Sequence, residues 1–318
     1  MKKIFVAVMA MAAFVACSNE EQVAAPQGQA IAFGDAFVDN STKAIYEGEN
    51  KLTKFTVWGS VEGVALYGET GATVSTGGDY NTIWTCSETR YWTPLCDFEF
   101  FATAHATVAA GDVVNGIPTK FSYTADGTTD LLCSTAVAKA TTDETGTPTA
   151  TTNGSLKTIG NETVVAFTMK HLLSRIAFKY TVAADVDPDY TYNVTDVKVA
   201  GGYLTGVCTP AGEWSEQDGT MPDLTFNNTG DAYVIIPGAP ALTISLTAEV
   251  VFGGEVISTV PYTITLNKTI EDTDFTFEAG NAYVFAVELP VPGKEIKFTV
   301  EDVENFGTPT PGNGDINM

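Results

Sequence analysis

The sequence predicts an all-β protein built from two tandem antiparallel β-sandwich domains of a transthyretin-like or Greek-key kind, with little helix. Apolar residues alternate with polar ones at a period of two in many short segments, and helical periodicity is nearly absent. Turn-forming Gly, Pro, Asn and Asp separate these segments at short intervals. The 318-residue length is enough for two cores, and the abundance of Thr and Val favours strands.

The formal charge restricts the classes of partner. The chain has 16 Lys and Arg against 39 Asp and Glu, a net charge of −23. Without Lys2 and Lys3, which belong to a predicted signal peptide, 14 basic residues remain and the net charge is −25. So acidic a surface argues against nucleic acid and anionic membrane surfaces as partners.

Residues 1–17 have the organisation of an export signal. A basic start precedes the apolar segment 4–15, which is too short to span a membrane, and Phe14-Val-Ala-Cys17 ends it. This end resembles a bacterial lipobox, cleaved before Cys17 and lipidated on its thiol. The alternative is an ordinary signal peptide with an incidental cysteine. The acidic pair in Ser18-Asn-Glu-Glu21 resembles a surface-export signal of Bacteroidetes lipoproteins, which predicts an outer-membrane, cell-surface location.

Residues 18–43 are predicted to be a flexible tether followed by a removable strand. Simple alternation places Ile31, Phe33 and Phe37 on one face of this strand. The segment ends in a polar stretch at Lys43, where a trypsin-like protease could cut the bond to Ala44.

The first sandwich is predicted over residues 44–158. Its expected strands are 52–60, the aromatic segment 97–102, 113–123 and 130–139. Phe98 and Phe100 alternate with Asp97 and Glu99, which predicts one buried face. The Thr/Gly/Pro-rich stretch 141–154 is expected to be a long loop at the end of this domain.

The second sandwich is predicted over residues 159–293, with a helical turn over His171–Arg175 and a tight hairpin at Gly253-Gly254. Its expected strands are 163–169, 176–182, 192–199, 202–208, 232–236, 242–252, 255–266 and 283–289.

The tail, residues 294–318, offers a second strand with an alternating apolar face. Ile296, Phe298 and Val300 alternate with polar residues, and Val303 and Phe306 follow in a shifted register. The tail pattern therefore resembles that of residues 29–38 at the other end of the chain.

Catalytic and metal-binding templates fail, so the sequence predicts no enzyme, no cofactor and no metal site. The two histidines, His105 and His171, stand in no recognisable motif with a Ser or Cys. The carboxylates between Asp185 and Asp189 match the start of a calcium loop, but Tyr190 stands where the loop needs Gly. A solvated acidic turn is the alternative at this place.

Cysteine and tryptophan leave two further alternatives open. Cys86 and Cys96 are close enough in sequence to link neighbouring strands, or all of Cys86, Cys96, Cys133 and Cys208 are small thiols within the fold. The tryptophans could stack on sugars at an exposed site or pack in the cores; they are Trp58, Trp84, Trp92 and Trp214.

Several motifs, taken in order, resemble the fimbrillin superfamily of Bacteroidales, the subunits of type V pili. They are the lipobox, Thr42-Lys-Ala44, Asp97-Phe-Glu-Phe-Phe-Ala102, the segment Val165–Phe178 with its Lys-His-Leu-Leu-Ser-Arg run, Phe277–Tyr283 and Phe298-Thr-Val-Glu-Asp302. The family's tail often carries an aromatic residue after the Glu-Asp pair, where this chain has Val303.

The resemblance implies a mechanism of assembly. Family members are exported as lipoproteins, and a surface trypsin-like protease removes the N-terminal segment, here between Lys43 and Ala44. The C-terminal strand of the next subunit then fills the opened groove; here it would carry Ile296, Phe298, Val300, Val303 and Phe306. The implied function is a structural pilus subunit with a role in adhesion. A surface lipoprotein that binds glycan or host protein, or an anchor subunit that keeps its lipid, is the alternative.

Overall fold

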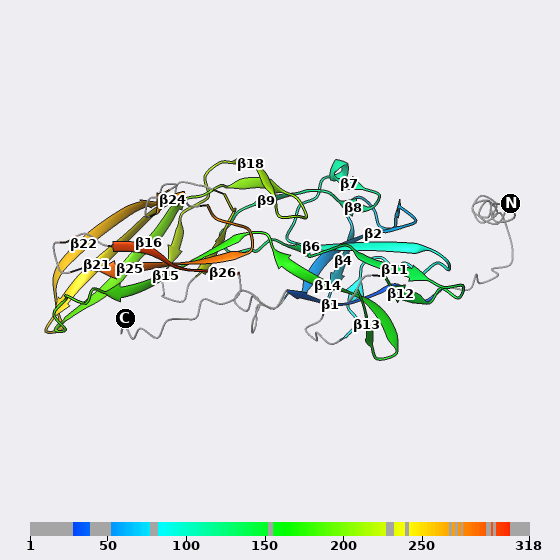
Figure 1. The fold of residues 1–318 in the computed structure, drawn as a ribbon, viewed down its shortest axis with the longest axis horizontal. Coiled ribbons are helices and arrows are strands. Elements are labelled where there is room, and N and C mark those ends of the chain that lie inside the picture. Colours follow the sequence, from blue (N-terminus) through cyan, green and yellow to red (C-terminus); the bar gives the residue numbers. More distant parts are fainter. Residues whose placement is uncertain are drawn as a thin grey trace.

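The computed structural model describes residues 28–38, 52–76, 82–151, 155–226, 232–238, 242–266, 269–270, 273–274, 276–290, 294 and 297–305. The described chain forms an elongated molecule with two regions arranged end to end (Figure 1). The all-β prediction is confirmed, since regular structure in these residues is strand apart from a single 3₁₀ turn at Ala110–Asp112.

The N-terminal region is a large curved sheet. Its strands are β1 (Ala32–Val38), β2 (Lys54–Val61), β3 (Val64–Ala65), β4 (Ala72–Ser75), β5 (Thr85–Cys86), β6 (Asp97–Ala104), β10 (Leu132–Ser134), β11 (Ala138–Thr142), β12 (Pro148–Ala150), β13 (Leu156–Ile159) and β14 (Glu162–His171). The main path through the sheet is β1-β14-β10-β6-β2-β4-β5. The predicted alternation in β6 is present, since Phe98 and Phe100 are buried in the core of this region.

The C-terminal region is a sandwich of two four-stranded sheets among the described residues. One sheet consists of β20 (Ala232–Ile235), β15 (Ser174–Val182), β25 (Asn281–Leu289) and β26 (Lys297–Asn305), in that order. The other consists of β19 (Leu224–Phe226), β16 (Tyr190–Gly201), β21 (Leu242–Phe252) and β22 (Glu255–Leu266).

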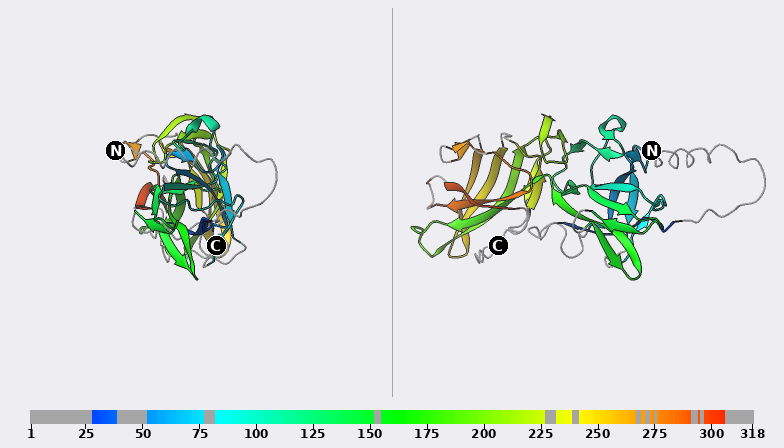
Figure 2. Two further views of the ribbon diagram at one scale, coloured as in Figure 1. Left: turned by 90° about the vertical axis from the view of Figure 1, so that its right-hand side faces the viewer. Right: turned by 45° about the vertical axis from the view of Figure 1, so that its right-hand side comes forward.

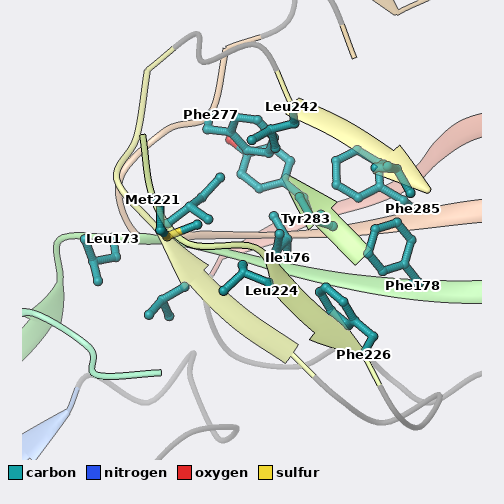
Figure 3. Packing of buried hydrophobic residues seen from close by; sticks show 14 of the residues in the cluster. Leu173, Ile176, Phe178, Met221, Leu224, Phe226, Leu242, Phe277, Tyr283 and Phe285 are labelled. Carbon is teal, nitrogen blue, oxygen red and sulfur yellow. The ribbon is translucent and has the colours of Figure 1, made fainter. Parts of the chain in front are cut away.

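Side chains from both sheets fill the C-terminal core (Figure 3). Phe178 of β15 meets Phe226 of β19 edge-on, with ring centroids 4.8 Å apart. Phe285 of β25 packs beside Phe178 at 5.7 Å. The two regions therefore have separate core clusters, and the chain passes between them at the short connection between β14 and β15.

A small sheet links the two regions. It contains β9 (Phe121–Thr124), β17 (Thr205–Cys208) and β18 (Trp214–Asp218), so that β9 from the first half pairs with β17 from the second. Residues 113–123, predicted as one strand, form the hairpin β7 (Val113–Val114) and β8 (Ile117–Pro118) followed by β9. Phe121 and Tyr123 belong to the C-terminal core.

The predicted domain boundary between residues 158 and 159 falls inside β13, which pairs with β14. Because Val165, Phe167 and Met169 of β14 lie in the N-terminal core, and Leu172 and Leu173 lie in the C-terminal core, the cores divide at the end of β14. A composition change marks a loop, but it does not reveal which core the next strand joins.

Three further local predictions differ in outcome. The hairpin at Gly253-Gly254 is confirmed, with positive φ at both glycines and strands β21 and β22 at the predicted bounds. The helical turn at His171–Arg175 is wrong: β14 ends at His171 and β15 begins at Ser174. The long loop 141–154 instead contains β12, paired with β11.

Two pairings are parallel, although the sequence predicted antiparallel sheets. β1 lies parallel to β14, and β15 lies parallel to β25. Both directions matter for the site, because they fix which way the first and last strands run along the molecule. The short hairpin β23 (Thr269–Ile270) and β24 (Thr273–Asp274) completes the described strands.

Candidate functional site: the strand that closes the N-terminal barrel

β1 joins the two ends of the N-terminal sheet. One edge of β1 pairs with β14, its neighbour in the path, from Ala32↔Val164 to Val38↔Met169. The other edge meets the segment 84–92 that contains β5, at the far end of the path, through the bridges Ala30↔Tyr91 and Phe33↔Trp84. The sheet thus becomes a closed barrel, and β1 is the strand that closes it.

Backbone hydrogen bonds hold this second edge. Ile31 donates its amide to the carbonyl oxygen of Arg90 (2.8 Å), and Trp84 donates to the carbonyl oxygen of Phe33 (2.9 Å). Trp92 donates to Gln29 (3.0 Å). Without β1, these groups and the facing edge of β14 would lose their partners, which would leave two open strand edges facing one groove.

Phe33 is the main side-chain anchor of β1. It is fully buried, and its ring lies against Phe100 (5.9 Å, edge-on), Phe167 (6.2 Å, stacked) and Tyr67 (6.4 Å). Ile31 is buried in the same core. The groove around β1 is therefore lined by aromatic side chains, which would be exposed to water if the strand left.

Phe37 does not follow the simple alternation that the sequence predicted. A bulge lies between the pairs Phe33↔Val165 and Ala36↔Phe167, so three steps along β1 match two along β14. Position 37 is consequently opposite the exposed Thr168, while positions 36 and 38 are opposite the core residues Phe167 and Met169. One extra residue in a strand exchanges the two faces beyond it.

The predicted donor strand lies at the edge of the C-terminal sandwich. β26 pairs with β25 in antiparallel fashion and is the terminal strand in the described order of its sheet. The register gives Phe298↔Val287, Val300↔Phe285 and Val303↔Tyr283, and all three β25 residues are buried in the core.

A bulge at residue 301 produces the shifted register that the sequence predicted for Val303. Val300 is paired with Phe285 and Asp302 with the adjacent Val284, which leaves Glu301 as the extra residue. The bulge therefore aligns position 303 with the same alternating set of β25 residues as positions 298 and 300. Phe298, Val300 and Val303 therefore all stand opposite core residues.

Several predicted site residues lie outside the described part of the chain. These are Cys17, Lys43, Ala44, Ile296 and Phe306. Lipidation, cleavage and the ends of the donor strand thus remain predictions.

Both histidines bind the same buried residue, which the sequence did not indicate. His171 Nδ1 contacts the carboxylate of Asp130, which is fully buried, and His105 Nδ1 donates to the Asp130 carbonyl oxygen (2.7 Å). Burial lowers the pKa of the neighbouring Arg175, and the Asp130 carboxylate opposes that shift. This cluster lies where β14 ends and β15 begins, which is the connection between the two cores.

The tryptophan alternatives are decided in favour of packing. Trp58, Trp84 and Trp92 are buried, and the half-buried Trp214 donates its indole N–H to the carbonyl oxygen of Leu172 (2.8 Å). None of these four offers the exposed ring that a sugar-stacking site requires.

The remaining alternatives concern thiols and carboxylates. Cys86, Cys96, Cys133 and Cys208 are all free thiols. Asp185 pairs with Lys294 (3.0 Å), and the Asp187 carboxylate accepts a bond from the Asp189 amide (3.0 Å). The described residues contain no group of three metal-ligating side chains and no helix long and apolar enough to span a membrane.

Comparison with known proteins identifies the family. A model of the fimbrillin-like family matches residues 42–302, so the chain belongs to this family. A search of curated proteins finds no match. Among solved structures, the fold is similar to a putative cell adhesion protein from Bacteroides uniformis, with 16% identity, a TM-score of 0.52 and coverage of 87% of this chain and 98% of the other.

A second similar structure is a fimbrial protein from Bacteroides vulgatus, with 14% identity and a TM-score of 0.53, covering 86% of this chain and 99% of that one. A third is a putative cell adhesion protein from Bacteroides ovatus, with 15% identity and a TM-score of 0.51, covering 88% and 99%. At such identities these likenesses establish the fold.

Proposed function

We propose that the protein is a structural subunit of a cell-surface pilus with a role in adhesion, assembled by strand exchange after proteolytic removal of β1. Membership of the fimbrillin-like family supports the class of function. The observation that carries the mechanism is the position of β1, the strand that closes the barrel between β14 and the segment 84–92.

A barrel that lacks one strand would bind another strand strongly. Two open backbone edges can each form ladder hydrogen bonds with an incoming strand, and the site of Phe33 offers an aromatic pocket. Burying each large apolar side chain contributes about 1.5–3 kcal/mol. β26 of a second copy supplies such a strand, because Phe298, Val300 and Val303 stand at positions that pair with core residues of β25.

The precursor would be a lipoprotein attached to the outer membrane through Cys17, and a trypsin-like protease would cut after Lys43. β1 would occupy the groove until that cut, so that identical subunits could not join early. A head-to-tail contact that does not close on itself produces a filament. The partners are then other copies of this chain or related pilus subunits.

N-terminal sequencing of protein recovered from the cell surface tests this proposal. We expect Ala44 as the first residue in assembled material. A blocked N-terminus at Cys17 in all surface material would instead indicate an anchor subunit or a lipoprotein that does not polymerise. In vitro, limited trypsin treatment should start slow oligomerisation, and a chain that is cut after Lys43 and stays monomeric would contradict the proposal.

A further inference from the structure

We infer that the incoming strand β26 enters the groove in the same direction as β1, with Phe298, Val300 and Val303 taking the places of Ile31, Phe33 and Ala36. This inference rests on the proposed strand exchange and goes beyond it by fixing direction and register. Two features of the fold lead to it: the spacing of the bulges restricts the register, and the place from which β26 starts sets the direction.

The two strands have the same anchor spacing. In β1, the positions on the core-facing side of the register are 31, 33, 36 and 38, since the bulge inserts one residue after Phe33. In β26, they are 298, 300 and 303, since the bulge inserts Glu301 after Val300. Both strands thus have the spacing of two steps and then three. Reversing β26 would place positions 303, 300 and 298 at 33, 36 and 38, so the spacing restricts the register and the path of the chain must set the direction.

The path of the chain gives the same direction. β14 runs toward the connection between the regions, and the parallel β1 therefore starts at the outer end of the barrel. β15 and the parallel β25 run away from that connection, so antiparallel β26 starts at the outer end of the sandwich. Figures 1 and 2 show these two outer ends at opposite extremes of the molecule.

The start of β26 is fixed at that outer end. Tyr192 donates its hydroxyl to the carbonyl oxygen of Pro290 (2.7 Å), and Lys294 pairs with Asp185. A released β26 would extend from this end toward the outer end of the next barrel, and eight residues from Pro290 to Phe298 span at most about 29 Å. A strand that ran the opposite way would first have to pass the whole groove.

The outer ends themselves carry exposed apolar side chains. Tyr91 and Leu95 lie at the outer end of the barrel, and Val182, Phe252 and Ile257 lie at the outer end of the sandwich. Head-to-tail copies would bring these two ends together beside the inserted strand. Contact with a second copy would then remove apolar surface that is open to water in the monomer.

One position requires an adjustment. In this register Glu301 takes the place of Gly34, where a Cβ atom would lie 2.9 Å from Val164 Cγ2 and 3.1 Å from Ile159 Cδ1. Because both contacts are side-chain ends, the side chains of β13 and β14 must shift when β26 enters. Glu301→Gly should therefore speed assembly several-fold, whereas Glu304→Gly should not.

Paired cysteines test direction and register in the full chain. In the inferred register Glu304 takes the place of Phe37, opposite the exposed Thr168. In the reverse direction, with positions 303, 300 and 298 at 33, 36 and 38, Thr299 would take that place. We therefore compare Thr168→Cys/Glu304→Cys with Thr168→Cys/Thr299→Cys, and use Thr168→Cys alone as the background for the native thiols.

Each variant is cut with trypsin, its oligomers are measured by size-exclusion chromatography, and mild oxidation is followed by non-reducing electrophoresis. We expect a cross-linked ladder several-fold above background for the Glu304→Cys pair only. A ladder for the Thr299→Cys pair, or oligomers that form without either ladder, would overturn the inferred direction and register while strand exchange stands. Absence of oligomers after release of β1 would overturn the proposed function, and this inference with it.

Discussion

β1 and β26 have similar patterns of sequence but very different surroundings. β1 has a backbone partner on each edge, β14 on one side and the segment 84–92 on the other. In the described residues β26 pairs with β25 alone. With a net gain of about 1 kcal/mol for each backbone hydrogen bond, a strand is held more firmly when both its edges are paired.

This difference in edge pairing favours movement of β26 from the sandwich into the barrel. The same strand, moved from the edge of the sandwich to the groove of a barrel, gains a second row of hydrogen bonds and an aromatic pocket. The loss of one edge pairing in the sandwich is therefore offset by two in the barrel.

Release of β1 should have the largest effect. After cutting and removal of residues 18–43, Trp84 and Trp92, which are 3% and 1% exposed, lose the backbone of β1 as a neighbour. We expect a red-shifted emission and stronger quenching by acrylamide, reversed when oligomers form. Deletion of residues 297–318 is the control, and should leave the emission of the uncut chain unchanged. Unchanged emission after release of β1 would mean that the barrel closes without it.

Phe33→Ala should have the next largest effect. Removing a fully buried phenylalanine costs about 3–5 kcal/mol, and here the loss falls on the barrel. We expect a lower urea midpoint for the barrel and faster loss of the cut strand, measured by tryptophan fluorescence. Phe298→Ala, at the edge strand, should leave the barrel transition in place. Equal effects of both substitutions on the barrel would contradict the comparison.

Removal of residues 294–318 should have a smaller effect on stability. The sandwich loses only an edge strand, so we expect it to keep a cooperative unfolding transition at a lower urea concentration. Oligomerisation of the trypsin-cut chain should stop altogether. If the truncated chain still forms oligomers, β26 is not the strand that is exchanged.

Thiol reactivity should show the smallest effect. Burial raises the pKa of Cys86, which packs at the margin of the barrel core on β5, whereas burial raises the pKa values of Cys133 and Cys208 to about 12. A raised pKa leaves less thiolate near pH 8, and exposure of Cys86 after release of β1 lowers its pKa toward the ordinary value. Iodoacetamide labelling, followed by mass spectrometry, should therefore increase several-fold at Cys86 alone, with Cys133 and Cys208 unlabelled throughout.

The sequence predicted the local features of the fold well. Alternation and turn residues give β21 and β22 with the hairpin between them at the predicted bounds, and they locate the buried face of β6. The shift at Val303 was also visible in the sequence, because three apolar positions failed to keep a period of two. These features depend on residues that are neighbours in the chain.

Other features of the site depend on partners distant in sequence. The bulge after Phe33 belongs to the pairing of β1 with β14, which lies some 130 residues away in the sequence. It places position 37 opposite Thr168 instead of opposite a core residue. The pairing of β9 with β17 and the binding of both histidines to Asp130 are of the same kind.

By itself, the sequence determined the all-β class, the position of most strands and the similar patterns at the two ends of the chain. Only the tertiary structure decided that β1 runs parallel to β14, closes a barrel and matches β26 in the spacing of its bulge. The physical reason is that side-chain alternation is set within a strand, whereas direction, bulges and open edges are set by the strand that pairs with it.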